Sequence, residues 1–420
     1  MNFRNLALTP VVVICCLCFS CGEKKQAMTE NISEDTTVVK ASTFGEDLEF
    51  LNRYVKTIVL QDASGKAKIA VSAALQGRVM TSTSDGASGL SYGWINKQAF
   101  LSGDTSDHMN AFGGEDRFWL GPEGGPYALY FKKGAPFEFE HWHVPRMLDL
   151  DSFDLESSEN SKAVFSKQAQ LTNYAGTDFN FRVKRTLCIL EQKEALARLG
   201  LPPETGVPSM VAFESVNELT NTGSHAWTKE TGVLSIWILG MYNPSAAATI
   251  IVPYEGSETE LMHIVNDDYF GSVPQDRLKM IGKTIYFKAD GKYRSKIGLA
   301  PEHAPEILGS YDADLGVLTV VKYTKPSGVT DYVNSLWEIQ KDPYKGDAVN
   351  AYNDGPPEPG AKPMGPFYEL ETSSPAASLE PDQKMTHVHT TFHFHGTASE
   401  LNIIMKQLFG ITCENVVAVF

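Results

Sequence analysis

The chain has 420 residues, of which 42% are hydrophobic and 10% aromatic, so it is long and apolar enough to bury a large core. Lysine and arginine number 36 against 51 aspartates and glutamates, which gives a formal net charge of −15. A surface of this charge repels nucleic acid and anionic lipid headgroups, and we therefore expect no nucleic-acid partner.

The N-terminal residues have the pattern of a secretory signal. An apolar stretch at 11–19 is too short for a stable membrane span. The sequence SCG that follows resembles a bacterial lipobox, in which Cys21 would become the lipidated first residue, although Cys18 replaces the usual leucine. We expect a signal peptide at 1–20 and an outer-membrane lipoprotein of the cell envelope, facing the periplasm or the cell surface. A cysteine-rich signal without lipidation is the alternative.

The composition changes after the signal. Residues 21–43 are polar and lack periodicity, which predicts a lipidated flexible tether, and we expect a single domain at 44–420. Three of the six cysteines lie in the signal and a fourth is Cys21, so the body keeps only Cys188 and Cys413. They would form either one disulfide or, as we prefer, two buried free thiols.

Strand patterns dominate the body. Short runs rich in β-branched residues are separated by turn residues, among 34 glycines and 22 prolines in the chain. The clearest runs are 56–62, 66–74, 283–299, 315–324 and 365–373. In 283–299, two runs flank Asp290-Gly291, which predicts a hairpin. These patterns predict an all-β fold, a large antiparallel sandwich in one domain.

Helix patterns are few. At 46–55, Leu48, Leu51 and Val55 lie on one side. The second helix is predicted at 397–410, where Thr397 and Glu400 are spaced as a capping box, apolar residues form a stripe, and Gly410 ends the pattern.

The first candidate for chemistry is the segment 77–96. Tyr92, Trp94 and Asn96 occupy alternate positions after a turn of small residues. Aromatic rings beside an amide suit sugar binding, because the C–H face of a sugar stacks on a ring and its hydroxyls take hydrogen bonds. An aromatic strand packed inward is the alternative.

The second candidate is 112–131, where charges lie between glycines and aromatic residues. Glu115 and Asp116 precede Arg117, and Trp119 and Glu123 follow. Charges in such surroundings must be paired, and glycines allow a ligand to approach the backbone. We prefer a ligand pocket to the alternative, a structural ion pair under a loop.

Two further segments carry paired acids. In 138–146, two glutamates alternate with His141 and His143 if the segment is a strand, which suggests acid–base chemistry or only a solvated face. In 365–373, Glu369 and Glu371 share one side of a strong strand. A carboxylate on a concave sheet face could act as a base or accept a sugar hydroxyl.

The segment HVHTTFHFH at 387–395 places four histidines on one strand face. They span about 26 Å, because same-face neighbours are about 6.6 Å apart, so they cannot all bind one ion. One His-x-His pair could do so with ligands from elsewhere, such as His141 and His143. We prefer a row of hydrogen-bonded imidazoles, and we expect no metal and no cofactor.

Three segments together resemble the galactose mutarotase-like, or aldose 1-epimerase-like, superfamily. They are GGEDRFWLGPEGG, VNELTNTGSHAW and FYELETSSPAASLEP, and the resemblance extends over about 45–410. More narrowly, the chain resembles uncharacterised lipoproteins of the Bacteroidota. The resemblance implies a β-supersandwich of two stacked antiparallel sheets with a sugar site on the concave face.

The resemblance also implies catalytic roles. In aldose 1-epimerases a late glutamate takes the proton of the anomeric hydroxyl, and Glu371 or the adjacent Glu369 is placed like it. A histidine on a central strand protonates the ring oxygen, but here that strand has Trp237 in the expected region, and His225 lies earlier in the turn. This departure favours a stacking platform over strict mutarotase activity.

Three hypotheses follow. The first is a carbohydrate-active enzyme with Glu371 as base and a histidine, such as His143, as acid. The second is a sugar-binding lipoprotein that uses an aromatic and arginine cradle: Tyr92, Trp94, Arg117, Trp119 and Trp237. The third is a structural envelope lipoprotein without a ligand. We expect a carbohydrate ligand, with catalysis left open.

Overall fold

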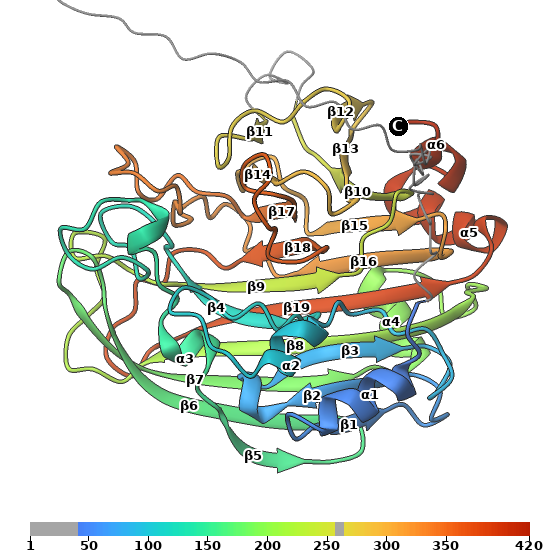
Figure 1. The fold of residues 1–420 in the computed structure, drawn as a ribbon, viewed down its shortest axis with the longest axis horizontal. Helices are drawn as coiled ribbons and strands as arrows, with labels where there is room; N and C mark the ends of the chain where they lie inside the picture. The colour runs from blue at the N-terminus through green and yellow to red at the C-terminus, as the bar shows by residue number, and fades with distance from the viewer. Residues whose placement is uncertain (1–40, 257–263) are drawn as a thin grey trace, which may run out of the picture. The chain divides into compact units, whose positions relative to one another are not determined.

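A computed structural model describes residues 41–256 and 264–420 (Figure 1). The predicted signal peptide at 1–20, the lipidation site Cys21 and nearly all of the tether at 21–43 lie outside these residues, so they stay predictions. Within the described residues, no helix is both long and apolar enough to cross a bilayer.

Three antiparallel sheets make up the described body, which confirms the all-β prediction. The ten-stranded sheet consists, in spatial order, of β12 (Leu278–Ile281), β13 (Thr284–Lys288), β10 (Ala248–Pro253), β15 (Ile307–Asp312), β16 (Val317–Tyr323), β19 (Lys384–His395), β8 (Ser209–Asn221), β7 (Asp178–Ile189), β6 (Lys162–Thr172) and β5 (Asp154–Ser158). The six-stranded sheet consists of β11 (Val265–Asn266), β14 (Ser295–Leu299), β17 (Val349–Asn353), β18 (Tyr368–Ser373), β9 (Ser235–Tyr242) and β4 (Arg117–Gly121). The small sheet consists of β1 (Ile58–Gln61), β2 (Lys68–Ser72) and β3 (Arg78–Thr83).

Helices are short, as the sequence predicted. The α-helices are α1 (Phe44–Asn52), α2 (Lys97–Ser102), α3 (Arg146–Asp149), α4 (Gln192–Leu199), α5 (Ala398–Phe409) and α6 (Cys413–Val417). Single 3₁₀ turns are η1 (Ala73–Leu75) and η2 (Phe139–His141). In α5 the capping box of Thr397 and Glu400 is present, and Gly410 ends the helix at φ +69°. The predictions of α1 and α5 are confirmed.

The six-stranded sheet packs one of its faces, here named the inner face, against the ten-stranded sheet. Apolar residues of the inner face, such as Phe118, Ile236 and Ile238, are fully buried. Burial of each such side chain contributes about 1.5–3 kcal/mol. Polar contacts also join the layers: Tyr368 Oη on β18 lies 2.8 Å from Ser310 Oγ on β15. The opposite, outer face of the six-stranded sheet is therefore free to carry other chemistry.

The far side of the ten-stranded sheet is covered by helices. Leu401, Ile404 and Met405 of α5 are buried in a cluster that includes Phe392 and Phe394 of β19. In Figure 1, α4 and α5 lie alongside β8, β19 and β16. The period of α5 thus supplies an apolar stripe to an apolar sheet face. Cys188 and Cys413 are free thiols, and both belong to this region.

The predicted hairpin at Asp290-Gly291 is wrong. The strand before it, β13, pairs with β10 and β12 in the ten-stranded sheet, whereas β14 pairs with β17 in the six-stranded sheet. Asn353 of β17 holds this connection, because its Oδ1 accepts from Gly291 N at 2.8 Å and its Nδ2 donates to Tyr293 O at 2.9 Å. A bend does form at Asp290-Gly291, but it connects strands of two different sheets.

The segment 138–146 is also not a strand. His141 N donates to Glu138 O and Trp142 N donates to Phe139 O, which closes the 3₁₀ turn η2. Pro145 then precedes α3. The proposed alternation of two glutamates with His141 and His143 therefore does not exist, and the segment is a loop over the outer face of the six-stranded sheet.

The histidine segment is a central strand. Within β19, between β16 and β8, His387, His389 and His393 are fully buried and point toward the six-stranded sheet. Thr372 Oγ1 of β18 lies 2.9 Å from both His387 Nε2 and His389 Nδ1. Burial lowers the pKa of each of these two histidines to about 3, so both are neutral. They are hydrogen-bonded groups between two layers.

Candidate functional site

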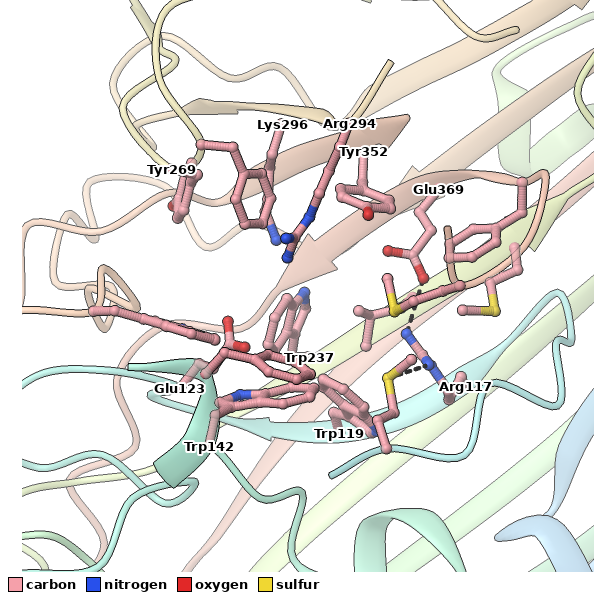
Figure 2. A pocket seen from close by; sticks show the side chains of 18 of the residues that line it. Arg117, Trp119, Glu123, Trp142, Trp237, Tyr269, Arg294, Lys296, Tyr352 and Glu369 are labelled. Carbon is pink, nitrogen blue, oxygen red and sulfur yellow. Dashed lines mark hydrogen bonds and ion pairs between the residues drawn. The ribbon is translucent and has the colours of Figure 1, made fainter. Parts of the chain in front are cut away.

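A cavity of about 260 Å³ lies on the outer face of the six-stranded sheet (Figure 2). Strand alternation produces its floor: Trp237, Leu239 and Met241 of β9 line the cavity, whereas Ile236 and Ile238 between them are in the core. On β4, Arg117 and Trp119 line it for the same reason. Loops from distant parts of the sequence complete the walls.

Sheet register brings the polar floor together. Lys296 of β14 is opposite Tyr352 of β17, Tyr352 is opposite Glu369 of β18, and Glu369 is opposite Met241 of β9. One row across four strands thus carries a cation, a phenol and a carboxyl side by side on the same face. No local sequence pattern connects these positions, because only strand pairing makes them neighbours.

Aromatic side chains form most of the walls. Four of the chain's six tryptophans line the cavity, among nine aromatic residues in all: Trp119, Phe139, Trp142, Trp237, Tyr269, Phe270, Trp337, Tyr352 and Phe367. Trp142 and Trp337 are stacked at 5.7 Å between ring centroids, and Trp119 meets Trp237 edge-on at 5.6 Å. These contacts fix ring orientation, so flat apolar faces are presented without further ordering.

Arg117 and Glu369 form an ion pair at the cavity wall. Arg117 Nη2 donates to Glu369 Oε1 at 2.8 Å, and both side chains are almost fully buried. The guanidinium also lies 4.4 Å from the centroid of Trp119. Burial raises the pKa of Glu369 to about 8; Arg117 opposes this shift, and the nearby Glu371 adds to it. Glu369 is therefore a carboxyl poised to gain or lose a proton near neutral pH.

A second charged group lies beneath the floor. Glu371 Oε2 accepts from Lys296 Nζ at 2.9 Å and from Trp237 Nε1 at 3.0 Å, and Glu371 is fully buried. Burial lowers the pKa of Lys296, but the attraction of Glu371 and then of Glu123 outweighs it, so the net shift is upward. Lys296 stays charged, with its ammonium 4.7 Å from the Trp237 ring centroid.

Glu123 enters from the loop after β4. Among the described residues it has no ion-pair partner within 4.0 Å. Burial raises its pKa, while the charge of Lys296 and the nearby indoles of Trp142 and Trp337 act in the opposite direction. In Figure 2 its carboxyl points into the cavity at the end opposite Glu369. The cavity thus offers hydrogen-bonding groups at both ends of an aromatic enclosure.

Five of the residues predicted from the sequence line this cavity. They come from β4, the loop after it, β9 and β18, and they are Arg117, Trp119, Glu123, Trp237 and Glu369. Segments more than a hundred residues apart in the sequence meet at this cavity.

Three residues predicted from segment 77–96 do not line the cavity. The Tyr92 ring stacks on His393 at 4.5 Å, and its hydroxyl lies 2.6 Å from Ser84 Oγ. Trp94 packs against Phe367 at 4.6 Å. Asn96 caps α2, because its Oδ1 accepts from Ala99 N at 3.1 Å. The alternative of an inward-packed aromatic segment describes them better.

Three predicted charged residues are also placed elsewhere. Glu115 is fully buried, and its Oε2 lies 2.7 Å from His393 Nε2. His143 stacks on His108 at 4.9 Å, with Nδ1 2.8 Å from Asp107 O. Glu371 lies under the floor rather than in it. The reason is the same for each: a partner within the protein already takes up the group.

Sequence reasoning missed much of the enclosure. Trp142, Trp337, Tyr269, Arg294 and Lys296 line the cavity but carried no recognisable motif. One signal was available, since Arg294 and Lys296 alternate with Ile297 and Leu299 and so predict one charged face on an otherwise apolar strand. The tryptophans lie in loops, where alternation gives no guidance.

Comparison with solved structures finds similar chains from several bacteria. A putative aldose 1-epimerase from Escherichia coli K12 aligns with a TM-score of 0.50 at 11% identity, covering 81% of this chain and all of that one. A protein from Synechocystis sp. PCC 6803 aligns at 0.49, with 11% identity over 81% of this chain and 96% of its own. A putative mutarotase from Salmonella typhimurium aligns at 0.46, with 11% identity over 82% and 92%.

The alignment with the Escherichia coli structure, at a TM-score of 0.50, supports the fold that the resemblance implied, and at 11% identity it addresses the fold alone. A search among curated proteins finds no match to the sequence. A family description does match, over residues 42–420. The chain therefore belongs to DUF6786, a protein family of unknown function.

Proposed function

We propose that this protein binds a carbohydrate in the aromatic cavity on the outer face of its six-stranded sheet. The observation that carries the proposal is the convergence of four tryptophans with Arg117, Lys296, Glu123 and Glu369 around one cavity of about 260 Å³. Ligand sites are typically apolar hollows with a few placed polar groups, commonly of about 300–1,000 Å³, so this one suits a small ligand.

The lining matches the chemistry of a sugar ring. Indole faces such as those of Trp142 and Trp337 can stack on the C–H face of a pyranose. Hydroxyls at the ring edge both donate and accept, and the cavity provides donors from Arg117 and Lys296 and acceptors from Glu123 and Glu369. A purely apolar ligand would leave these charged groups unsatisfied.

Binding is favoured over mutarotation. Among the described residues that line the cavity there is no histidine to protonate a ring oxygen. Of the two residues placed like the epimerase base, Glu371 is held beneath the floor by Lys296 and Trp237, whereas Glu369 lines the cavity without a histidine beside it in the lining. The acid–base pair that the resemblance implied is thus not assembled in this cavity.

One observation favours a second candidate, an enzyme that uses Glu123 and Glu369. Burial raises the pKa of both carboxyls, to about 8 for Glu369, and Figure 2 places them at opposite ends of the cavity. This arrangement would let one group donate a proton to a bound sugar while the other accepts one.

The binding proposal is tested by a screen of immobilised glycans and free monosaccharides, followed by calorimetry on each hit. Trp337→Ala should weaken binding about tenfold or more, since tryptophan anchors carry much of a ligand's affinity. Ile339→Ala, in the same loop and 63% exposed, is the matched control. The proposal fails if no glycan binds or if the two variants bind equally well.

Catalysis is tested on the same ligands by anomer-exchange NMR and by analysis of cleavage products. If Glu369 acts as acid or base, Glu369→Gln should slow turnover about 100-fold or more while the ligand still binds. Binding without exchange or cleavage by the wild type would eliminate the enzyme candidate and leave a binding protein.

We also propose that Cys21 anchors the chain in the cell envelope as an outer-membrane lipoprotein. The apolar stretch at 11–19 followed by SCG supports this. Expression in a bacterial host with labelled palmitate should label the wild type and leave Cys21→Ser unlabelled. Equal labelling of both would exclude this site.

A further inference from the structure

Arg294 differs from the other cations of the cavity. It immediately precedes β14, it is half-buried, and Figure 2 shows its guanidinium pointing into the cavity. Its Nε is buried without a hydrogen-bond partner, and no carboxylate of the described residues forms an ion pair with it. By contrast, Arg117 pairs with Glu369 and Lys296 pairs with Glu371.

The nearest acidic candidate is already engaged. Asp354 feels the charge of Arg294, which helps to lower the pKa of that aspartate against the larger effect of burial. Its two oxygens, however, accept from Tyr352 Oη at 2.8 Å and from Gly365 N at 2.9 Å. Arg294 therefore keeps donors that the protein itself does not satisfy.

The guanidinium is nevertheless held in place. It lies 4.0 Å from the centroid of Phe270, which also lines the cavity. Stacking on an aromatic face restricts the plane of the guanidinium while leaving its edge free. An edge of parallel N–H groups is the geometry that binds an oxyanion through two hydrogen bonds.

The pairing of the charged groups in the cavity supports the same conclusion about Arg294. Arg117 and Lys296 are each held by a carboxyl group, that of Glu369 and that of Glu371, whereas Arg294 and Glu123 have no ion-pair partner among the described residues. Figure 2 shows these two separated, with Glu123 beside Trp142 and Arg294 above Tyr352. A ligand bound between them would meet a cation at one end and a hydrogen-bond acceptor at the other.

We propose, building on the proposed carbohydrate-binding function, that the sugar carries an oxyanion substituent and that Arg294 is its receptor. The substituent would be a carboxylate, a sulfate ester or a phosphate ester, since all three present paired oxygens to a guanidinium. The ligand class is then acidic sugars, with the ring stacked on the tryptophans and the anion docked beside Phe270.

Calorimetry with matched sugars tests this proposal. The probes are galactose, galacturonate, galactose 6-sulfate and galactose 6-phosphate, with the corresponding glucose series in parallel. The wild type should bind at least one anionic member about tenfold or more tightly than its neutral parent, the scale of a charge-assisted contact. The anionic arms also distinguish carboxylate from sulfate and phosphate.

Variants locate the effect. Arg294→Gln should abolish the preference, so that the anionic sugar binds no more tightly than its neutral parent. Arg294→Lys, which keeps the charge but loses the paired donors, should retain part of the preference. Arg53→Gln removes the same charge from an exposed position at the end of α1, outside the cavity, and should leave the preference unchanged. Circular dichroism checks that each variant is folded.

The outcomes separate this inference from the proposed function. Wild-type protein that binds neutral and anionic members equally, or a preference that survives in folded Arg294→Gln, would overturn the role of Arg294 while the carbohydrate site stands. Absence of binding to every sugar in the glycan screen, neutral or acidic, would overturn both. The wild-type comparison decides the matter even if a variant does not fold.

Discussion

The two faces of the six-stranded sheet both carry polar and charged residues, but these residues have different roles on each face. On β18, Thr372 points to the inner face and bonds His387 and His389 across the layers, whereas its neighbour Glu371 points the other way, toward the cavity floor. Also between the layers, Asp116 pairs with Arg185, and both are fully buried.

The difference lies in how completely the groups are paired. Between the layers, polar groups meet partners from the other sheet and are closed to solvent, so they hold the layers in register. On the outer face, Arg117 and Lys296 are paired yet still line a cavity, and Arg294 has no counter-ion. Polar residues on a face that no second sheet covers stay accessible from the cavity, so they are the ones that a ligand can contact.

The inner-face pair of Asp116 and Arg185 gives the largest expected effect. Asp116→Ala would leave a buried guanidinium without a counter-ion, and we expect the free energy of unfolding to fall by about 3–5 kcal/mol. Urea denaturation measures it. Glu218→Ala, which breaks the partly exposed pair with Lys384, should cost less than about 1 kcal/mol. Similar losses in the two variants would contradict the distinction between closed and open pairs.

The inner-face histidines should make the fold sensitive to acid. Because their folded-state pKa of about 3 lies below the ordinary 6.5, the unfolded chain binds more protons between these values. The free energy of unfolding should therefore be highest above pH 6.5. It should fall as the pH drops toward 3, by at most about 1.4 kcal/mol per pH unit for each histidine.

Denaturation at several pH values in that window provides the measurement. His389→Asn should reduce the slope of the free energy of unfolding against pH by the amount that corresponds to about one proton. His225→Asn, at an exposed turn position, should leave the slope unchanged. An unaltered slope in His389→Asn would mean that His389 is not kept neutral by burial.

The outer-face carboxyl of Glu369 should have the opposite and smaller effect. Its folded-state pKa of about 8 lies above the ordinary 4.5, so the folded chain holds a proton that the unfolded chain has lost between these values. The protonated carboxyl therefore contributes to the free energy of unfolding, and this contribution is fully present below pH 4.5. It is lost as the pH rises through 8, by less than about 1.4 kcal/mol per pH unit. Glu369→Gln should remove this loss, while Glu338→Gln, on an exposed loop, should retain it. Identical profiles for the two variants would show that Arg117 keeps Glu369 charged throughout.

The site was predictable where strands carry it. Arg117, Trp119 and Glu369 occur in segments whose alternation and mixture of charge with aromatic residues were unusual in the sequence. Trp142 and Trp337 were missed because loop conformation, set by contacts such as Trp142 on Trp337, has no period that a sequence displays. Glu115 was misassigned because only the structure reveals its partner His393.

The sequence by itself determined the elements, because alternation, caps and turn residues act over a few positions: β19 with its buried histidines and α5 with Thr397 and Gly410 were both legible. Tertiary structure alone decided which elements became neighbours. Asn353 bonds the connection that leads β14 into the second sheet, and strand register sets Lys296, Tyr352 and Glu369 in one row. Pairing between distant strands depends on the fit of whole faces, and no short segment contains that information.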